Sequence, residues 1–218
     1  MKFVIEYSET NFANDYKIYL ENLAKTFLYD RFLANSPKDY FEIIYVNNGQ
    51  QKNSYKDIDI NKLNQGTAVE NFIFNYLDYL LWQDYRAAKN YFKIKNGQAF
   101  IDNRIKDFEY TFRSSIEHYY PQHPIDENLR LKGKDAEWID DFGNLCLISS
   151  SKNSRLSNFM PTAKKDYYTG SLTIDSIKQR IMMEYEYWDT NGTNNYNEIE
   201  EHSKKMIEIL INLKKLNL

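Results

Sequence analysis

Two long stretches in the first half of the chain repeat apolar residues at three- and four-residue steps. This spacing predicts helices over residues 10–34 and about 68–92, each with one buried face. The first helix should end at Asn35-Ser36-Pro37, since a residue before proline disfavours the α region. The buried faces are predicted from Phe12, Tyr16, Tyr19, Leu20, Leu23, Phe27 and Leu28, and from Val69, Phe72, Ile73, Tyr76, Leu77, Leu80 and Leu81.

Shorter apolar runs suggest strands. The run Phe41–Val46 fits a strand or a short helix, and its pattern leaves both open. Phe108, Tyr110 and Phe112 alternate with polar residues, and Ile116 and Tyr120 do so less cleanly, which predicts a strand that leads into Glu117 and His118. The apolar run Leu145–Ile148 predicts a second strand. Residues 152–167 indicate a loop followed by a helix. Two closing helices are expected at Thr173–Trp188 and Asn197–Leu216.

These elements predict an α+β fold that is predominantly α-helical, with a small antiparallel ββα core embedded in helices. A division is expected near residue 100, with a helical scaffold over residues 1–100 and the strands and closing C-terminal helices over residues 101–218. Low counts of glycine (7) and proline (4) favour long helices over a turn-rich all-β fold.

Composition narrows the classes of function. The 218 residues carry a net charge of −3, which argues against a broad, non-specific coat on DNA but allows a local basic face. A single cysteine, Cys146, excludes an internal disulfide and a zinc site built on paired cysteines. No signal segment and no apolar run of membrane-spanning length is present, so we expect a cytoplasmic protein with no membrane partner.

The segment Ser115–Gln122 places an acidic residue, Glu117, directly before His118. A histidine can take a proton near neutral pH, which suits it to activate water as a general base. Carboxylate and amide oxygens are ligands for Mg²⁺ or Mn²⁺, so Glu117 and Asn153 are the candidate metal ligands. Asn144 lies just before the second predicted strand and is expected to hold the loop that orients His118.

The strand geometry imposes a condition on this set. Adjacent residues of a regular strand point to opposite faces, so Glu117 and His118 can address one phosphate only where the chain twists or bulges. His123 is a rival general base, although it follows Pro121 and so lies beyond the predicted strand. His202, on the last predicted helix, is expected to be structural or exposed.

A local basic cluster accompanies the motif. Its members are Lys152, Arg155, Lys164 and Lys165. Contact with DNA phosphates and a solvated helix face are both open interpretations of this cluster.

The combined pattern resembles a known family. Glu117–Gln122, Gly143–Ile148 and Ser151–Asn158 are similar to the two strands and the helix of HNH, or ββα-metal (His-Me finger), nucleases. Residues 108–165 more closely resemble the C-terminal nuclease domain of GmrSD-type restriction proteins, which are modification-dependent (type IV) anti-phage endonucleases, and Phe72–Trp82 is also similar to them.

The resemblance implies a metal-dependent DNA endonuclease that uses Mg²⁺ or Mn²⁺ and no zinc, acting on DNA that carries modified bases. It implies that His118, Asn144 and Asn153 follow one another in the motif, with Glu117 where many HNH proteins carry aspartate. Members usually have an N-terminal nucleotide-hydrolysing domain, to which this chain shows no match. We therefore expect that domain, or an equivalent partner subunit, to lie outside this chain.

Two other functions fit the same residues. A non-catalytic module could bind DNA or a partner protein on a ββα scaffold, which the negative net charge favours. An RNA-directed or toxin-like nuclease could use the same active site, because the chemistry takes place at the phosphate. Cleavage assays on DNA and RNA distinguish these two functions from a DNA endonuclease.

Overall fold

The computed structural model describes residues 11–87, 102–156, 158–186, 188 and 195–211. The chain separates into two compact units, Met1–Leu63 and Asn64–Leu218. The division expected near residue 100 falls outside the described residues. Within the described part, no helix is both long and apolar enough to cross a membrane.

The first unit is helical. Helix α2 (Phe12–Thr26) continues into a π-helical turn at Phe27–Phe32, which confirms the helix predicted over residues 10–34. A second π-helical turn at Glu42–Val46 shows that this apolar run is helical. The loop that follows is fixed by the buried Asp30, whose carboxylate accepts backbone hydrogen bonds from Lys52 and Asn53, both at 2.8 Å.

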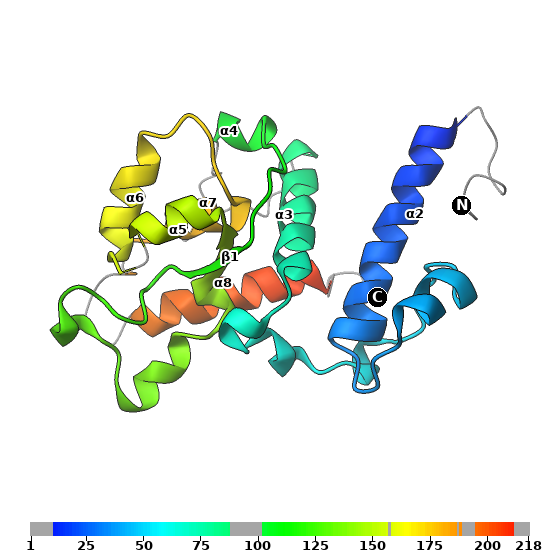
Figure 1. Cartoon of the computed structure of the whole chain (residues 1–218), viewed down its shortest axis with the longest axis horizontal. Coiled ribbons are helices and arrows are strands. Elements are labelled where there is room, and N and C mark those ends of the chain that lie inside the picture. Colours follow the sequence, from blue (N-terminus) through cyan, green and yellow to red (C-terminus); the bar gives the residue numbers. More distant parts are fainter. Residues whose placement is uncertain (1–10, 88–101, 157, 187, 189–194, 212–218) are drawn as a thin grey trace. The chain divides into compact units, whose positions relative to one another are not determined.

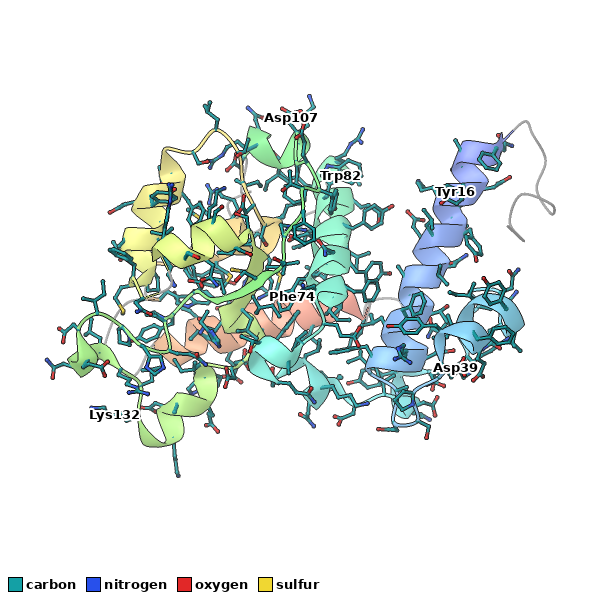
Figure 2. All side chains as sticks on the ribbon, in the orientation of Figure 1. Tyr16, Asp39, Phe74, Trp82, Asp107 and Lys132 are labelled. Carbon is teal, nitrogen blue, oxygen red and sulfur yellow. The ribbon has the colours of Figure 1, made fainter. Side chains whose placement is uncertain are left out.

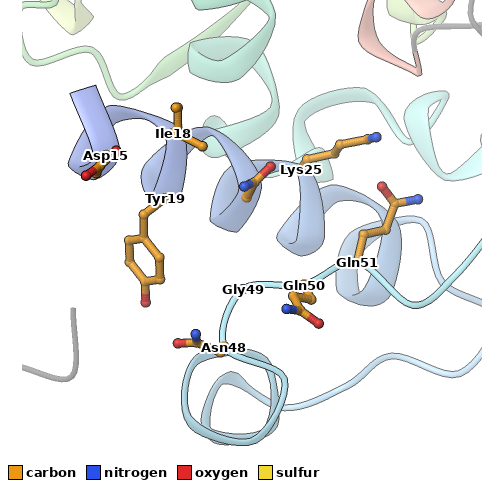
Figure 3. A pocket seen from close by; sticks show the side chains of 9 residues that line it. Asp15, Ile18, Tyr19, Lys25, Asn48, Gly49, Gln50 and Gln51 are labelled. Carbon is orange, nitrogen blue, oxygen red and sulfur yellow. The ribbon is translucent and has the colours of Figure 1, made fainter. Parts of the chain in front are cut away.

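A cavity of about 350 Å³ opens in this unit between α2 and the turn around Gly49 (Figure 3). Asn48 and Gly49 both have positive φ (50° and 68°), which turns the chain back beside the helix. The Thr26 hydroxyl donates to the Gly49 carbonyl at 2.7 Å and so fixes this turn to α2. Tyr19, Lys25 and Gln50 are among the side chains that line the cavity.

The second unit holds the remaining helices and the strands (Figure 1). Its helices are α3 (Asn71–Arg86), α4 (Asn103–Lys106), α5 (Ser150–Leu156), α6 (Pro161–Thr169), α7 (Ile177–Met182) and α8 (Asn195–Leu210). Helix α3 packs against both α7 and α8. The predicted last helix is confirmed by α8 as far as Leu210, and residues 212–216 lie outside the described part.

The helix predicted over Thr173–Trp188 is much shorter than expected. It begins only at Ile177, because Ser176 caps it by accepting a hydrogen bond from the Gln179 backbone N–H at 3.2 Å. Residues before Ser176 form bends, in which Asp175 accepts hydrogen bonds from Ser149.

Among the described residues, the sheet consists of two antiparallel strands, β1 (Ser115–His118) and β2 (Leu145–Ile148). The register pairs Ser115 with Ile148 and His118 with Leu145. The prediction of β2 is therefore confirmed.

The strand predicted to lead into the Glu117–His118 motif forms only at Ser115–His118, and its expected beginning at residues 108–112 pairs with no strand of the described chain. Phe112 is 89% exposed, so the alternating pattern does not face the core throughout. The chain is instead held just beyond this segment by Arg113, whose buried guanidinium pairs with the Asp78 carboxylate of α3.

The core of the second unit packs β1 and β2 against the helices that follow them. Its buried members are Tyr119, Tyr120, Ile139, Cys146, Ile148, Leu156, Tyr168, Met182, Met183, Trp188 and Ile199. Cys146 is a free thiol within this core.

A buried lysine connects α7 to the start of β2. Lys178 Nζ donates to the Phe142 carbonyl at 2.5 Å and also to the carbonyl of Leu145. Burial lowers the pKa of Lys178 to about 8. The lysine therefore fixes the turn that leads into β2, where Asn144 lies.

Candidate active site

The predicted site residues lie along β1 and fall into two groups. Glu117 pairs with Cys146 and His118 with Leu145 in an uninterrupted ladder. Alternation along a regular strand therefore directs Glu117 and His118 to opposite faces. The bulge that would have aimed both side chains at one point does not occur within β1.

The first group lies on the face that α5 and α6 cover. Asn153 of α5 donates from Nδ2 to the Ser115 hydroxyl at 2.5 Å. Ser115 is two residues before Glu117, so Asn153 and Glu117 address the same face about 7 Å apart along the strand. The Oδ1 atom of Asn153 is buried and has no hydrogen-bond partner within the described part of the chain.

The buried Lys164 of α6 closes this group. Its Nζ lies 2.5 Å from Glu117 Oε1 and donates to the carbonyls of His118 at 2.7 Å and Tyr119 at 3.1 Å. Lys164 has no exposed surface, so it does not offer the surface charge that was predicted to contact DNA. Burial raises the pKa of Glu117, and the Lys164 ammonium partly offsets that shift.

The second group is a histidine–carboxylate pair. His118 Nε2 and Asp140 Oδ1 lie 2.8 Å apart, with His118 8% exposed and the Asp140 side chain 52% exposed. Burial lowers the pKa of His118 from its ordinary value of 6.5, although the bond to Asp140 opposes the shift. The imidazole is therefore neutral near pH 7 and able to accept a proton.

Asn144 joins the turn after β1 to the start of β2. Its Oδ1 accepts from the Tyr120 backbone N–H at 2.7 Å and from Trp188 Nε1 at 3.2 Å. Its Nδ2 donates to the carbonyls of Tyr120 and Ile139, both at 3.0 Å. With no exposed surface, Asn144 lies where it can hold the turn beyond His118, and it has no free face for substrate.

The remaining residues of the basic cluster are not equivalent. Lys152 Nζ lies 2.5 Å from Asp175 Oδ1, so an acidic partner already neutralises its charge. Arg155 and Lys165 are exposed, and Arg155 makes a long contact of 3.4 Å to the Tyr167 hydroxyl. Two of the four predicted cations thus remain available at the surface.

The other histidines occupy different surroundings. His123 is exposed on the loop after Pro121. His202 has no exposed surface and packs edge-on against Tyr185 and Trp188. Neither ring nitrogen of His202 has a hydrogen-bond partner in the described chain, so His202 is a core residue.

Asp140 was not singled out from the sequence. It follows the 3₁₀ turn Gly133–Trp138 and lies 22 positions after His118, with no local motif to connect them. The chain carries 31 acidic residues, so composition could not distinguish this one. Only the fold brings Asp140 to the histidine.

The candidate metal ligands are oxygen atoms on β1 and α5. Within the described residues, no three side chains of His, Cys, Asp or Glu cluster. Glu117 and Asn153 supply one carboxylate and one unpartnered amide oxygen, and hard oxygen ligands of this kind are those that Mg²⁺ prefers. The cation would share the Glu117 carboxylate with Lys164.

Fold and site together define a mostly helical α+β domain with a small antiparallel sheet and a histidine–carboxylate pair at the end of its first strand. The family model for the C-terminal domain of GmrSD restriction endonucleases matches residues 49–209, and the chain belongs to this family. The resemblance found in the sequence is thus confirmed, and it identifies a restriction-endonuclease domain whose substrate is DNA. Neither curated proteins nor solved structures give a match.

Proposed function

We propose that this domain is a metal-dependent, HNH-type DNA endonuclease that hydrolyses phosphodiester bonds with His118 as the general base. The observation that carries the proposal is the bond between His118 and Asp140 at the end of β1. A neutral imidazole with one nitrogen bound to a carboxylate can take a proton from water at the other nitrogen. His118 also lies inside the region that matches the restriction-endonuclease family.

Glu117 and Asn153 would hold the cation on the face of β1 opposite to His118. A bound Mg²⁺ or Mn²⁺ would neutralise charge on the phosphate. The scissile phosphate would lie at the end of β1, beside His118 and the half-exposed Asp140 side chain. Lys164 keeps this end in place through the carbonyls of His118 and Tyr119.

Arg155 and Lys165 are the proposed phosphate contacts, because both are exposed and carry charge beside the site. Lys152 would contribute less, since Asp175 neutralises it. We further propose that the target DNA carries modified bases, that an N-terminal nucleotide-hydrolysing domain or partner subunit completes the system, and that it acts in the cytoplasm.

The test is plasmid cleavage by the wild type and by His118→Ala, each with Mg²⁺, with Mn²⁺ and with chelator. We expect metal-dependent cutting that falls by a factor of about 10² or more in the variant, since general bases contribute about 10²–10⁴. Unmodified DNA, hydroxymethylated DNA, glucosylated DNA and RNA run in parallel, which separates modification dependence and RNA cleavage from general DNA cleavage.

His123→Ala is the matched control, because it removes an exposed imidazole from the following loop. It should cut at the wild-type rate. Equal cutting by the wild type and His118→Ala would exclude His118 as the base. DNA binding that persists in chelator, without cutting in any metal, would favour a non-catalytic binding module.

A further inference from the structure

We propose that Asp140 is a positioning residue for His118, fixing which ring nitrogen carries the proton and where the ring points. This inference rests on the proposed function, in which His118 is the base. Nothing in the local sequence around the Glu117–His118 motif assigns a role to Asp140.

The geometry of the His118–Asp140 pair determines which atom donates the hydrogen bond and which accepts it. Asp140 Oδ1 lies 2.8 Å from His118 Nε2, which is the length of a charge-assisted hydrogen bond. An ionised carboxylate only accepts, so the neutral imidazole must place its proton on Nε2. Nδ1 then carries the lone pair and is the atom that can take a proton from water.

Asp140 is itself held in place. Gly66 lies directly against it, since a Cβ on Gly66 would come within 2.5 Å of Asp140 Oδ1. Gly66 also has a φ of +57°, a backbone conformation that residues other than glycine rarely adopt. The Asn64 side chain accepts a hydrogen bond from the Phe142 backbone N–H at 3.0 Å, which fixes the chain two residues beyond Asp140.

Among the described residues, Asp140 and Lys164 are the charged groups that act on the His118 imidazole. Lys164 donates to the backbone carbonyl of His118 and so fixes the position of the strand. The orientation of the His118 imidazole depends on Asp140. Gln122 Nε2 makes a longer contact of 3.4 Å to the same Asp140 oxygen.

The exposure of Asp140 favours a role in positioning His118 over a role in stabilising the fold. The Asp140 side chain is 52% exposed, and exposed ion pairs add little to stability. Removing the negative charge of Asp140 should therefore leave the fold intact but no longer fix the orientation of the His118 imidazole. An asparagine at this position can donate to Nε2, which would favour the opposite tautomer.

The first experiment measures the tautomer directly, by long-range ¹H–¹⁵N NMR of histidine-labelled full chain near pH 7.5. The His118 signals are assigned with His118→Ala. We expect the Nε2–H form in the wild type and loss of that preference in Asp140→Asn. The same tautomer in both proteins would overturn the proposal, and this arm needs no cleavage activity.

The second experiment measures steady-state cleavage. Asp140→Asn should lower kcat by about a hundredfold with KM nearly unchanged, within the range of general-base effects. Asp140→Glu should restore part of the loss, and Asp135→Asn, an exposed carboxylate on the neighbouring turn, should cut normally. Thermal unfolding of each variant checks that it is folded.

The outcomes separate the two proposals. Wild-type cutting by His118→Ala would remove the proposed function, whatever the NMR shows. An inactive His118→Ala beside a fully active Asp140→Asn would leave the base in place and overturn only the role of Asp140. Gly66→Ala, which pushes on the carboxylate without changing its charge, should reproduce the kcat loss in part.

Discussion

Individual charged residues in the second unit lie inside it and bind oxygen atoms of the chain. Lys178 binds the turn before β2, Lys164 binds the end of β1, and Arg113 pairs with Asp78. A buried cation that lost its partners would be costly, so each fixes the segment that it binds. Two of these cations hold the strand ends at which the site lies.

The Lys164-Lys165 pair illustrates why exposure was not predictable from residue type. Adjacent helical residues differ by about 100° around the axis, so one can face the core while the next faces water. In α6, Lys164 is fully buried and Lys165 is exposed. Lys164 is the buried residue of the two because its ammonium binds oxygen atoms of the strand below α6. These are the Glu117 carboxylate and the carbonyls of His118 and Tyr119.

At the scale of a residue, His202 predicts a pH dependence of stability. Burial lowers its pKa well below 6.5, so the folded protein holds the neutral ring. The unfolded chain takes up a proton as the pH falls below about 6.5, and the free energy of unfolding should drop by up to about 1.4 kcal/mol per pH unit until the folded pKa is reached. Above that range the stability is fully present.

Urea unfolding between pH 5 and 7 tests this, with His202→Leu as the comparison. The leucine variant should lose stability less steeply on acidification, because it has no ring to protonate. Comparing the two proteins cancels the contributions of His118 and Glu117. Identical slopes would show that His202 does not carry the effect.

At the scale of an element, the docking of α8 depends on Gly143. A Cβ at this position would overlap the Ile199 carbonyl oxygen and approach Ser203 Cβ to 3.0 Å. Gly143→Ala should therefore separate α8 from the turn before β2 and lower the free energy of unfolding by about 2 kcal/mol or more, as overpacking does. Thermal or urea unfolding measures the change.

Gly170→Ala is the matched control, because no described residue other than its chain neighbours lies within 4 Å of its Cβ position. It should leave stability within about 1 kcal/mol of the wild type. Equal effects of the two alanines would mean that α8 does not press on Gly143.

The accuracy of the predictions differed between elements for physical reasons. Helix α2, α8 and strand β2 follow from local apolar patterns, which suffice where one face is buried. The segment at residues 108–112 alternates but pairs with no described strand, since pairing depends on distant chain. Helix α7 starts late because Ser176 caps it.

At the scale of the molecule, a net charge of −3 must be reconciled with a DNA substrate. Exposed Arg155 and Lys165 provide the proposed local contacts. Each lost phosphate contact should reduce the slope of log K against log[salt] by about 0.9. We therefore expect Arg155→Ala and Lys165→Ala each to weaken DNA binding and flatten its salt dependence.

Fluorescence anisotropy in the His118→Ala background measures this binding without cleavage. Lys134→Ala, at an exposed lysine of the turn Gly133–Trp138, should leave the slope unchanged. Equal slopes for all variants would place the DNA on another surface.

The sequence alone determined the family, the predominance of helices, β2 and the Glu117–His118 motif, because these depend on local pattern and residue type. The tertiary structure decided the rest. It set Glu117 and His118 on opposite faces of β1, placed Lys164 inside, and brought Asp140 to the histidine from 22 residues away. These contacts depend on how distant segments pack, which a linear pattern does not specify.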